Sequence, residues 1–112
     1  MIRAQILALL TLFATLTGCR SPRIDVTIQN HTGTAIDLLE VNYPSASFGL
    51  EHLDADAVYQ YRIQTRGSGP IRLHYTEAAT HTQRQISGPT LQQDQSGSLR
   101  IELLPEGKVA FQ

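Results

Sequence analysis

Cys19 is the only cysteine in the 112-residue chain, and its surroundings are unusual. It follows an uncharged apolar run, residues 6–16, and two small residues, Thr17 and Gly18. A lone thiol has no partner within the chain for a disulfide bond, so it is either free or the site of a covalent modification. The choice between these two uses depends on the residues that precede it.

The N-terminal segment has the three parts of a secretory signal peptide. Residues 1–5 carry one positive charge on Arg3, residues 6–16 are apolar, and small residues follow immediately before Cys19. A helix needs about 20 apolar residues to span a bilayer, so this run is too short for a permanent span. The alternative, a helix buried in the domain, is disfavoured because the sequence turns polar and changes its periodicity after Cys19.

The four residues Leu16-Thr17-Gly18-Cys19 resemble the lipobox of bacterial lipoproteins, with Leu16, Thr17 and Gly18 as the peptidase recognition residues. The resemblance implies that residues 1–18 are removed and that Cys19 carries a diacylglycerol and further acylation. Because two or three acyl chains hold a protein firmly where one holds it marginally, the mature chain would be anchored to a membrane without spanning it. Within that family an aspartate after the cysteine is associated with retention in the inner membrane. The resemblance therefore implies that Arg20 favours the periplasmic face of an outer membrane, where the cell has one, over the cytoplasmic membrane.

Histidines and aspartates supply the remaining candidate chemistry. A hairpin with residues 78–79 at its tip would place His74 opposite Gln83, with His74 and His81 diagonal on one solvent face, about 7 Å apart at their β-carbons. Two imidazoles at that distance could share a copper or zinc ion, but most metal sites use three or four ligands. We therefore expect two surface histidines and no metal cofactor.

Acidic and hydroxyl side chains give no catalytic pattern. Asp54 and Asp56 could bind a hard cation or form a turn between strands. The serine-containing stretches 67–69 and 96–98 match no nucleophile elbow, so we expect no enzyme. Residues 96–98 do resemble part of a motif in small periplasmic lipoprotein inhibitors of lysozyme, which implies an inhibitor of a wall-degrading enzyme as an alternative function.

After residue 23 the apolar residues alternate with polar ones, the pattern of half-buried strands. Such runs cover residues 23–30, 35–43, 57–65, 71–77, 81–86, 98–104 and 108–111. Seven or eight short strands predict an antiparallel β-sandwich, immunoglobulin-like by default, with a small closed β-barrel as the alternative. The apolar phase changes at Leu38 and Leu39, which predicts a β-bulge there.

Aromatic residues indicate where a binding surface could lie. Most tyrosines of the mature chain fall on the apolar phase and are expected in the core, namely Tyr59, Tyr61 and Tyr75. Phe48 is the aromatic residue that alternation explains least, and it lies in a predicted longer connection, residues 43–49. We therefore expect a candidate binding loop that contains Tyr43, Ser47 and Phe48.

Length and charge limit the remaining possibilities. Residues 19–23 would form a lipidated tether and residues 24–112 a single domain. The whole chain has ten Asp and Glu against nine Lys and Arg, with no basic cluster, so nucleic acid is not an expected partner. We expect a non-enzymatic interaction or structural module of the cell envelope that works through loops or an edge strand. Its partner would be a protein, and the sequence leaves open both the identity of that protein and the oligomeric state.

The mature region also resembles small uncharacterised bacterial lipoproteins. The shared features are Asn30-His31-Thr32-Gly33, the segment from Tyr43 to Gly49, and the strand entry from Gly67 to Ile71. These proteins have no assigned activity, so the resemblance supports the fold and adds nothing about function.

Overall fold

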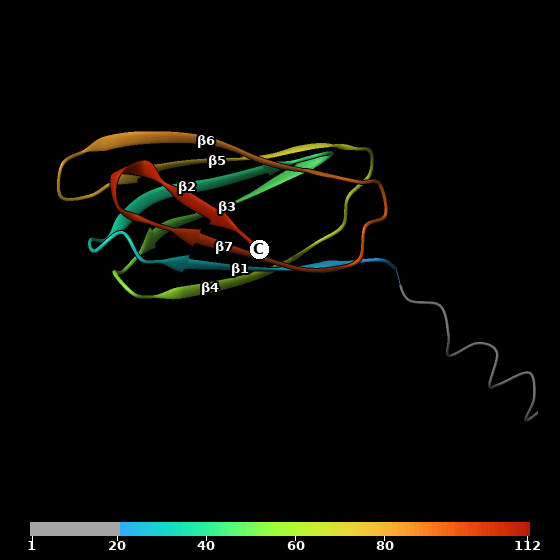
Figure 1. Ribbon diagram of the computed structural model, residues 1–112, viewed down its shortest axis with the longest axis horizontal. Coiled ribbons are helices and arrows are strands. Elements are labelled where there is room, and N and C mark those ends of the chain that lie inside the picture. The colour runs from blue at the N-terminus through green and yellow to red at the C-terminus, as the bar shows by residue number, and fades with distance from the viewer. Residues whose placement is uncertain (1–20) are drawn as a thin grey trace, which may run out of the picture.

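The computed structural model describes residues 21–112, which form eight strands and a short 3₁₀ turn (Figure 1). The strands are β1 (Ile24–Asn30), β2 (Ile36–Tyr43), β3 (Ala46–Leu53), β4 (Val58–Ile63), β5 (Gly69–Glu77), β6 (Thr82–Leu91), β7 (Gly97–Leu103) and β8 (Val109–Phe111), with η1 (Pro105–Gly107) before β8. The predicted signal peptide and the lipobox residues Leu16, Thr17, Gly18 and Cys19 lie outside the described residues.

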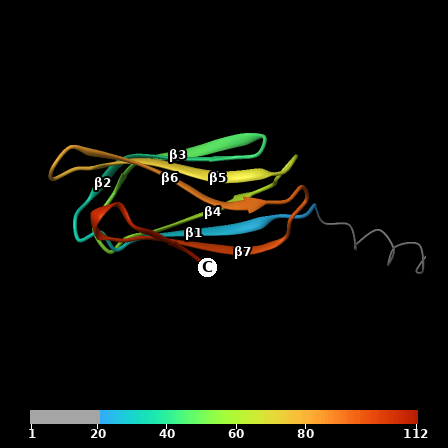
Figure 2. The same ribbon diagram turned by 45° about the horizontal axis from the view of Figure 1, so that its top comes forward.

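The strands form two four-stranded sheets that face each other, with the orders β4-β1-β7-β8 and β3-β2-β5-β6 (Figure 2). All pairings are antiparallel except that of β1 with β7, which is parallel. Within residues 21–112 the sheets stay separate, so the predicted β-sandwich is confirmed and the closed barrel is wrong. Two strand pairs match those of an immunoglobulin sandwich: β1–β4 corresponds to the B–E pair, and β2–β5 corresponds to the C–F pair. On the other side of β1, β7 occupies the position that strand A has in the immunoglobulin sandwich.

Alternation along the strands builds one core between the sheets. Its buried residues are Ile24, Val26, Ile28, Ile36, Leu39, Val41, Phe48, Leu53, Ile63, Ile71, Leu73, Tyr75, Leu91, Ile101 and Leu103. Full burial of one such aliphatic side chain is worth about 1.5–3 kcal/mol, so this core is the main source of stability. A register slip of one residue would turn a strand's apolar set toward solvent, so the core also fixes the register.

The predicted β-bulge in β2 is confirmed. Leu38 adopts a positive φ of 52°, and the pairing of β2 with β5 shifts between Asp37 and Glu40. Leu38 is 68% exposed, whereas Leu39 is 2% exposed. The bulge therefore lets Ile36 and Leu39 face the same core although they are three residues apart.

The segment predicted as a long connection is instead a β-hairpin. Tyr43 pairs with Ala46, so Pro44 and Ser45 form a two-residue turn, and β3 follows at once. The prediction was wrong because β3 is an edge strand with only two buried side chains, Phe48 and Leu53, which hides its alternation.

The predicted end of a strand at Ile86 was also wrong, because β6 continues to Leu91. Pro89 is tolerated there since β6 is an edge strand, where a missing N–H donor costs nothing to the sheet. Gly88 serves a packing purpose: a β-carbon at this position would lie 2.6 Å from Cζ of Phe111 and 2.7 Å from Cγ2 of Ile71. Gly88 thus allows β8 to pack against the edge of the opposite sheet.

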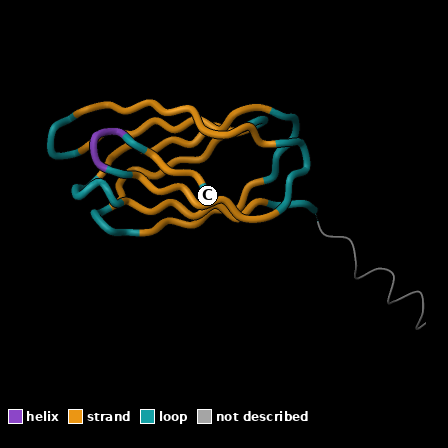
Figure 3. Tube along the Cα trace, in the orientation of Figure 1, coloured by secondary structure: helices purple, strands orange, loops and turns teal. Residues whose placement is uncertain are grey.

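Strand direction sorts the connections into two ends (Figure 3). The proximal end, from which β1 begins, contains Arg23 and the connections 44–45, 64–68 and 92–96. The distal end contains the connections 31–35, 54–57, 78–81 and 104–108.

Candidate functional site

The predicted histidine pair is not formed. His74 lies opposite Gln85 and Thr76 opposite Gln83, because the turn of the β5–β6 hairpin spans residues 78–81 rather than two alanines. His81 therefore lies in the turn itself, with a φ of 55°, and not on the strand diagonal to His74. Within residues 21–112 no group of three or more acidic, histidine or cysteine side chains is arranged to hold a metal ion.

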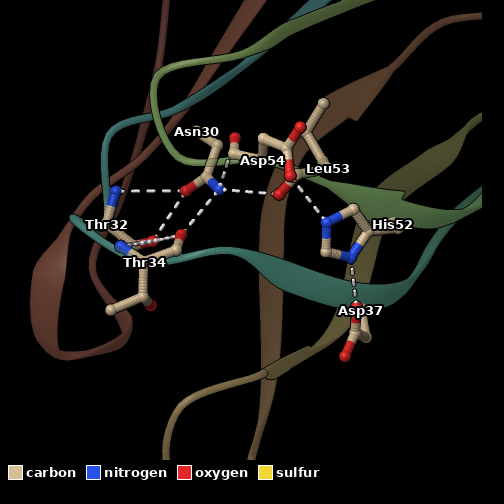
Figure 4. A network of polar contacts seen from close by, with 7 residues as sticks. All are labelled: Asn30, Thr32, Thr34, Asp37, His52, Leu53 and Asp54. Carbon is tan, nitrogen blue, oxygen red and sulfur yellow. Dashed lines mark hydrogen bonds and ion pairs between the residues drawn. The ribbon is translucent and has the colours of Figure 1, made fainter.

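The distal end is organised by the side chain of Asn30, which is fully buried (Figure 4). Its Nδ2 donates to the carbonyl oxygens of Thr34 at 2.8 Å, Leu53 at 3.1 Å and Asp54 at 3.0 Å. Its Oδ1 accepts from the Oγ1 of Thr32 at 2.7 Å. One amide thus joins the β1–β2 connection to the β3–β4 connection, so Asn30-His31-Thr32-Gly33 has a structural role.

Beside this hub, the ring of His52 lies between two carboxylates, an arrangement we call the His52 clasp (Figure 4). Nδ1 contacts Oδ1 of Asp37 at 2.6 Å, and Nε2 contacts Oδ1 of Asp54 at 2.7 Å. The hydrogen bonds to Asp37 and then Asp54 favour the protonated ring and raise the pKa of His52 above its ordinary value of 6.5, while desolvation opposes them.

The clasp limits what these side chains can do chemically. When both ring nitrogens of His52 donate to carboxylates, neither has a lone pair to accept a proton or bind a metal. Asp54 is occupied by the ring, and Asp56 shapes the turn with a φ of 65° while its N–H donates to the carbonyl of Asn30. The polar side chains of His52, Asp37 and Asp54 are therefore engaged with one another.

A second distinctive region is an aromatic cluster between the edge strands β3 and β4. Phe48 stacks on Tyr61 with ring centroids 4.4 Å apart, and Tyr43 and Tyr59 each lie 6.3 Å from Phe48. Phe48 is 8% exposed, whereas Tyr61 is 42% exposed. Of the candidate binding residues, Tyr43 and Phe48 therefore belong to a packed side of the sandwich, and Ser47 is exposed on β3.

Burial explains the behaviour of the tyrosines in and near this cluster. Desolvation raises the pKa of Tyr43, with Tyr61 adding to the rise and Arg23 opposing it. Tyr75, at 2% exposed, is core as predicted, and its burial likewise raises its pKa. Tyr61 departs from the core prediction because β4 is an edge strand, which leaves one side of its ring open to solvent.

The four edge strands differ in their capacity to accept another strand. β6 contains Gly88 and Pro89, and β8 has only three residues. β3 carries the clasp residue His52 and contains Gly49. β4 has neither glycine nor proline, and Val58 and Tyr61 are exposed on it, so β4 is the edge best suited to strand addition.

The sequence analysis did not identify the His52 clasp. Asp37 and His52 are directly opposite in the β2–β3 pairing, and they would have been found had residues 46–53 been recognised as a strand. Asp54 was considered only for its spacing to Asp56, whereas its actual partner is two residues upstream.

No protein-family model matches the chain, and no curated protein matches it. The fold is similar to an NMR structure of a protein from Eubacterium rectale, with a TM-score of 0.59 and 13% sequence identity. The alignment covers 85% of this chain and 93% of that chain. At this identity the similarity concerns the fold alone. Among residues 21–112 there is also no helix with the length and hydropathy that a membrane span requires.

Proposed function

We propose that this protein is a lipid-anchored envelope lipoprotein whose β-sandwich is a non-enzymatic interaction module. The observation that carries the proposal is the position of Cys19, which follows an apolar run and a lipobox-like triplet and precedes the first strand by only five positions. Diacylation or triacylation of Cys19 would hold the domain on the membrane surface, because each buried methylene contributes about 0.8 kcal/mol.

The N-terminus of the processed protein tests the anchor. We expect mass spectrometry to find a peptide that begins at Cys19 and carries acyl chains, and Cys19→Ser to leave the protein uncleaved at that site. The matched control is Ser21→Cys in the Cys19→Ser background, which keeps a thiol but displaces it from the lipobox. An unmodified Cys19, or a mature chain that starts elsewhere, would contradict the proposal.

The interaction surface that the geometry supports is the free edge of β4 with the aromatic cluster beside it. An added strand would gain backbone hydrogen bonds from β4, and its inward side chains would contact Tyr59 and Tyr61. Tyr61 is held in place by its stack on Phe48, so little side-chain entropy would be lost on binding.

Site-specific photocrosslinking in cells tests this surface. A photoreactive phenylalanine analogue at position 61 is expected to give a discrete protein adduct, whereas the same analogue at Gln85 on edge strand β6 is expected to give none. Val58→Lys should weaken the adduct, because a charge on the edge opposes strand addition. Equal adducts at positions 61 and 85 would assign no special role to β4.

A further inference from the structure

The proximal end is a continuous surface in which separate connections are bonded together. The N–H of Arg66 donates to Oγ of Ser45 at 3.2 Å, which ties the β4–β5 connection to the β2–β3 turn. The N–H of Gln93 donates to Oγ of Ser68 at 3.0 Å, which adds the β6–β7 connection. The N–H of Gly97 donates to the carbonyl of Arg23, so the start of the domain belongs to the same surface (Figure 1).

Charge is divided unequally between the two ends of the described domain. The proximal end carries four arginines and two aspartates, a net charge of +2, from Arg23, Arg62, Arg66, Arg72, Asp25 and Asp94. The distal end carries seven carboxylates and two cations, a net charge of −5 with histidines neutral, from Asp37, Glu51, Asp54, Asp56, Glu77, Glu102, Glu106, Arg84 and Lys108.

The proximal arginines are available to an external partner. All four are exposed, and within residues 21–112 only Arg62 is engaged in an ion pair, with Asp25 at 2.8 Å. Tyr43 and Tyr61 lie next to them, and tyrosine and arginine together are typical of surfaces at a membrane–water interface.

We infer that the proximal end is a contact surface for anionic phospholipid headgroups, which holds the sandwich upright with its distal end directed away from the membrane. The inference rests on the lipid anchor proposed above. Residues 20–23 span at most about 14 Å when extended, so the anchor alone keeps the domain near the membrane but leaves it free to tilt. An anionic surface attracts the proximal end and repels the distal end, and this orients the domain within a Debye length of about 8 Å.

Energy transfer to the membrane surface tests this orientation in the lipidated full-length protein. The chain has no tryptophan, so Gln93→Trp and Ala79→Trp place single donors at the proximal and distal ends. The acceptor is a dansyl-labelled headgroup in vesicles of phosphatidylcholine with or without phosphatidylglycerol. With phosphatidylglycerol we expect transfer from position 93 to exceed that from position 79 by at least about threefold, and this ratio to fall with high salt or pure phosphatidylcholine.

Matched charge variants separate local contact from overall charge. The double variant Arg66→Glu and Arg72→Glu is expected to reduce the transfer ratio at least about twofold in anionic vesicles. The double variant Arg100→Glu and Lys108→Glu changes the net charge equally away from the proximal end, and it is expected not to reduce the ratio. Circular dichroism verifies that each variant is folded.

The outcomes distinguish failure of this inference from failure of the anchor. If mass spectrometry shows acylated Cys19 but the ratio is the same in neutral and anionic vesicles, or if both double variants act alike, the orientation is refuted and the anchor stands. If Cys19 is not acylated and the protein does not associate with vesicles, the anchor is refuted and the orientation falls with it.

Discussion

The two ends of the sandwich each contain a fully buried polar side chain, and they use it differently. At the distal end, Asn30 donates to three carbonyls and accepts from Thr32. At the proximal end, the hydroxyl of Thr65 donates to the carbonyl of Gln92 at 2.7 Å and accepts from the N–H of Gln95 at 3.3 Å. At each end of this sandwich, one buried polar side chain pairs with backbone groups of the connections that meet there.

The surroundings of the two hubs also differ. The distal hub lies beside the charged clasp of His52 with Asp37 and Asp54, so its neighbourhood responds to pH. The proximal hub is followed directly in the chain by the exposed Arg66. At the distal end four carboxylates are in ion pairs, whereas at the proximal end three of the four arginines are in none within residues 21–112.

Removal of the distal hub is expected to have the largest effect. Asn30→Ala leaves the carbonyls of Thr34, Leu53 and Asp54 without their buried donor, which should lower the free energy of unfolding by about 3 kcal/mol. Urea denaturation measures this as a lower midpoint with an unchanged slope. The control Asn42→Ala, on β2 of the opposite sheet and only half-buried, should cost less than about 1 kcal/mol. Equal costs for the two variants would remove the distinction between a hub and an ordinary asparagine.

Removal of the proximal hub should have a smaller effect, because Thr65 has fewer partners. Thr65→Val keeps the shape but deletes the hydroxyl, and we expect a loss of about 1–2 kcal/mol. Thr90→Val, on exposed edge strand β6, is the control and should be close to neutral. A loss for Thr65→Val as large as that for Asn30→Ala would show that the two ends are equally dependent on their hubs.

The smallest effect concerns pH and sharpens the contrast between the ends. Because the pKa of His52 is raised in the folded protein, the clasp contributes its full stability below pH 6.5 and loses it as the pH rises through the folded-state pKa. The melting temperature of the wild type relative to His52→Gln should therefore decline across that window. His74→Gln is the control for a general effect of losing a histidine, because within residues 21–112 the ring of His74 forms a hydrogen bond only with the side-chain amide of Gln85 and with no carboxylate. A difference that stays constant with pH would mean that the clasp does not form in solution.

The fold could be predicted to a large extent from local pattern, and the errors have physical causes. Ile24, Val26 and Ile28 alternate with polar residues and are buried as expected. The pattern failed at two edge strands, since β3 has only two buried side chains and β6 continues through Gly88 and Pro89, which are typical of a break.

The candidate sites were less predictable than the fold. The hub role of Asn30 depends on carbonyls more than twenty positions away, and the clasp depends on the register that places Asp37 opposite His52. The predicted His74–His81 pair failed because a turn two residues longer moved His81 off the strand. Spacing along a sequence reports on neighbours within a strand, whereas these contacts depend on pairing between strands.

The sequence by itself determined which face of most strands is apolar and where the single thiol stands, because both are properties of adjacent residues. Only the tertiary structure decided that β7 runs parallel beside β1, that His52 lies between two carboxylates, and that the two ends differ in the sign of their net charge. The reason is that these features arise from which strands pair and in which direction they run, and no local window of the chain contains both partners.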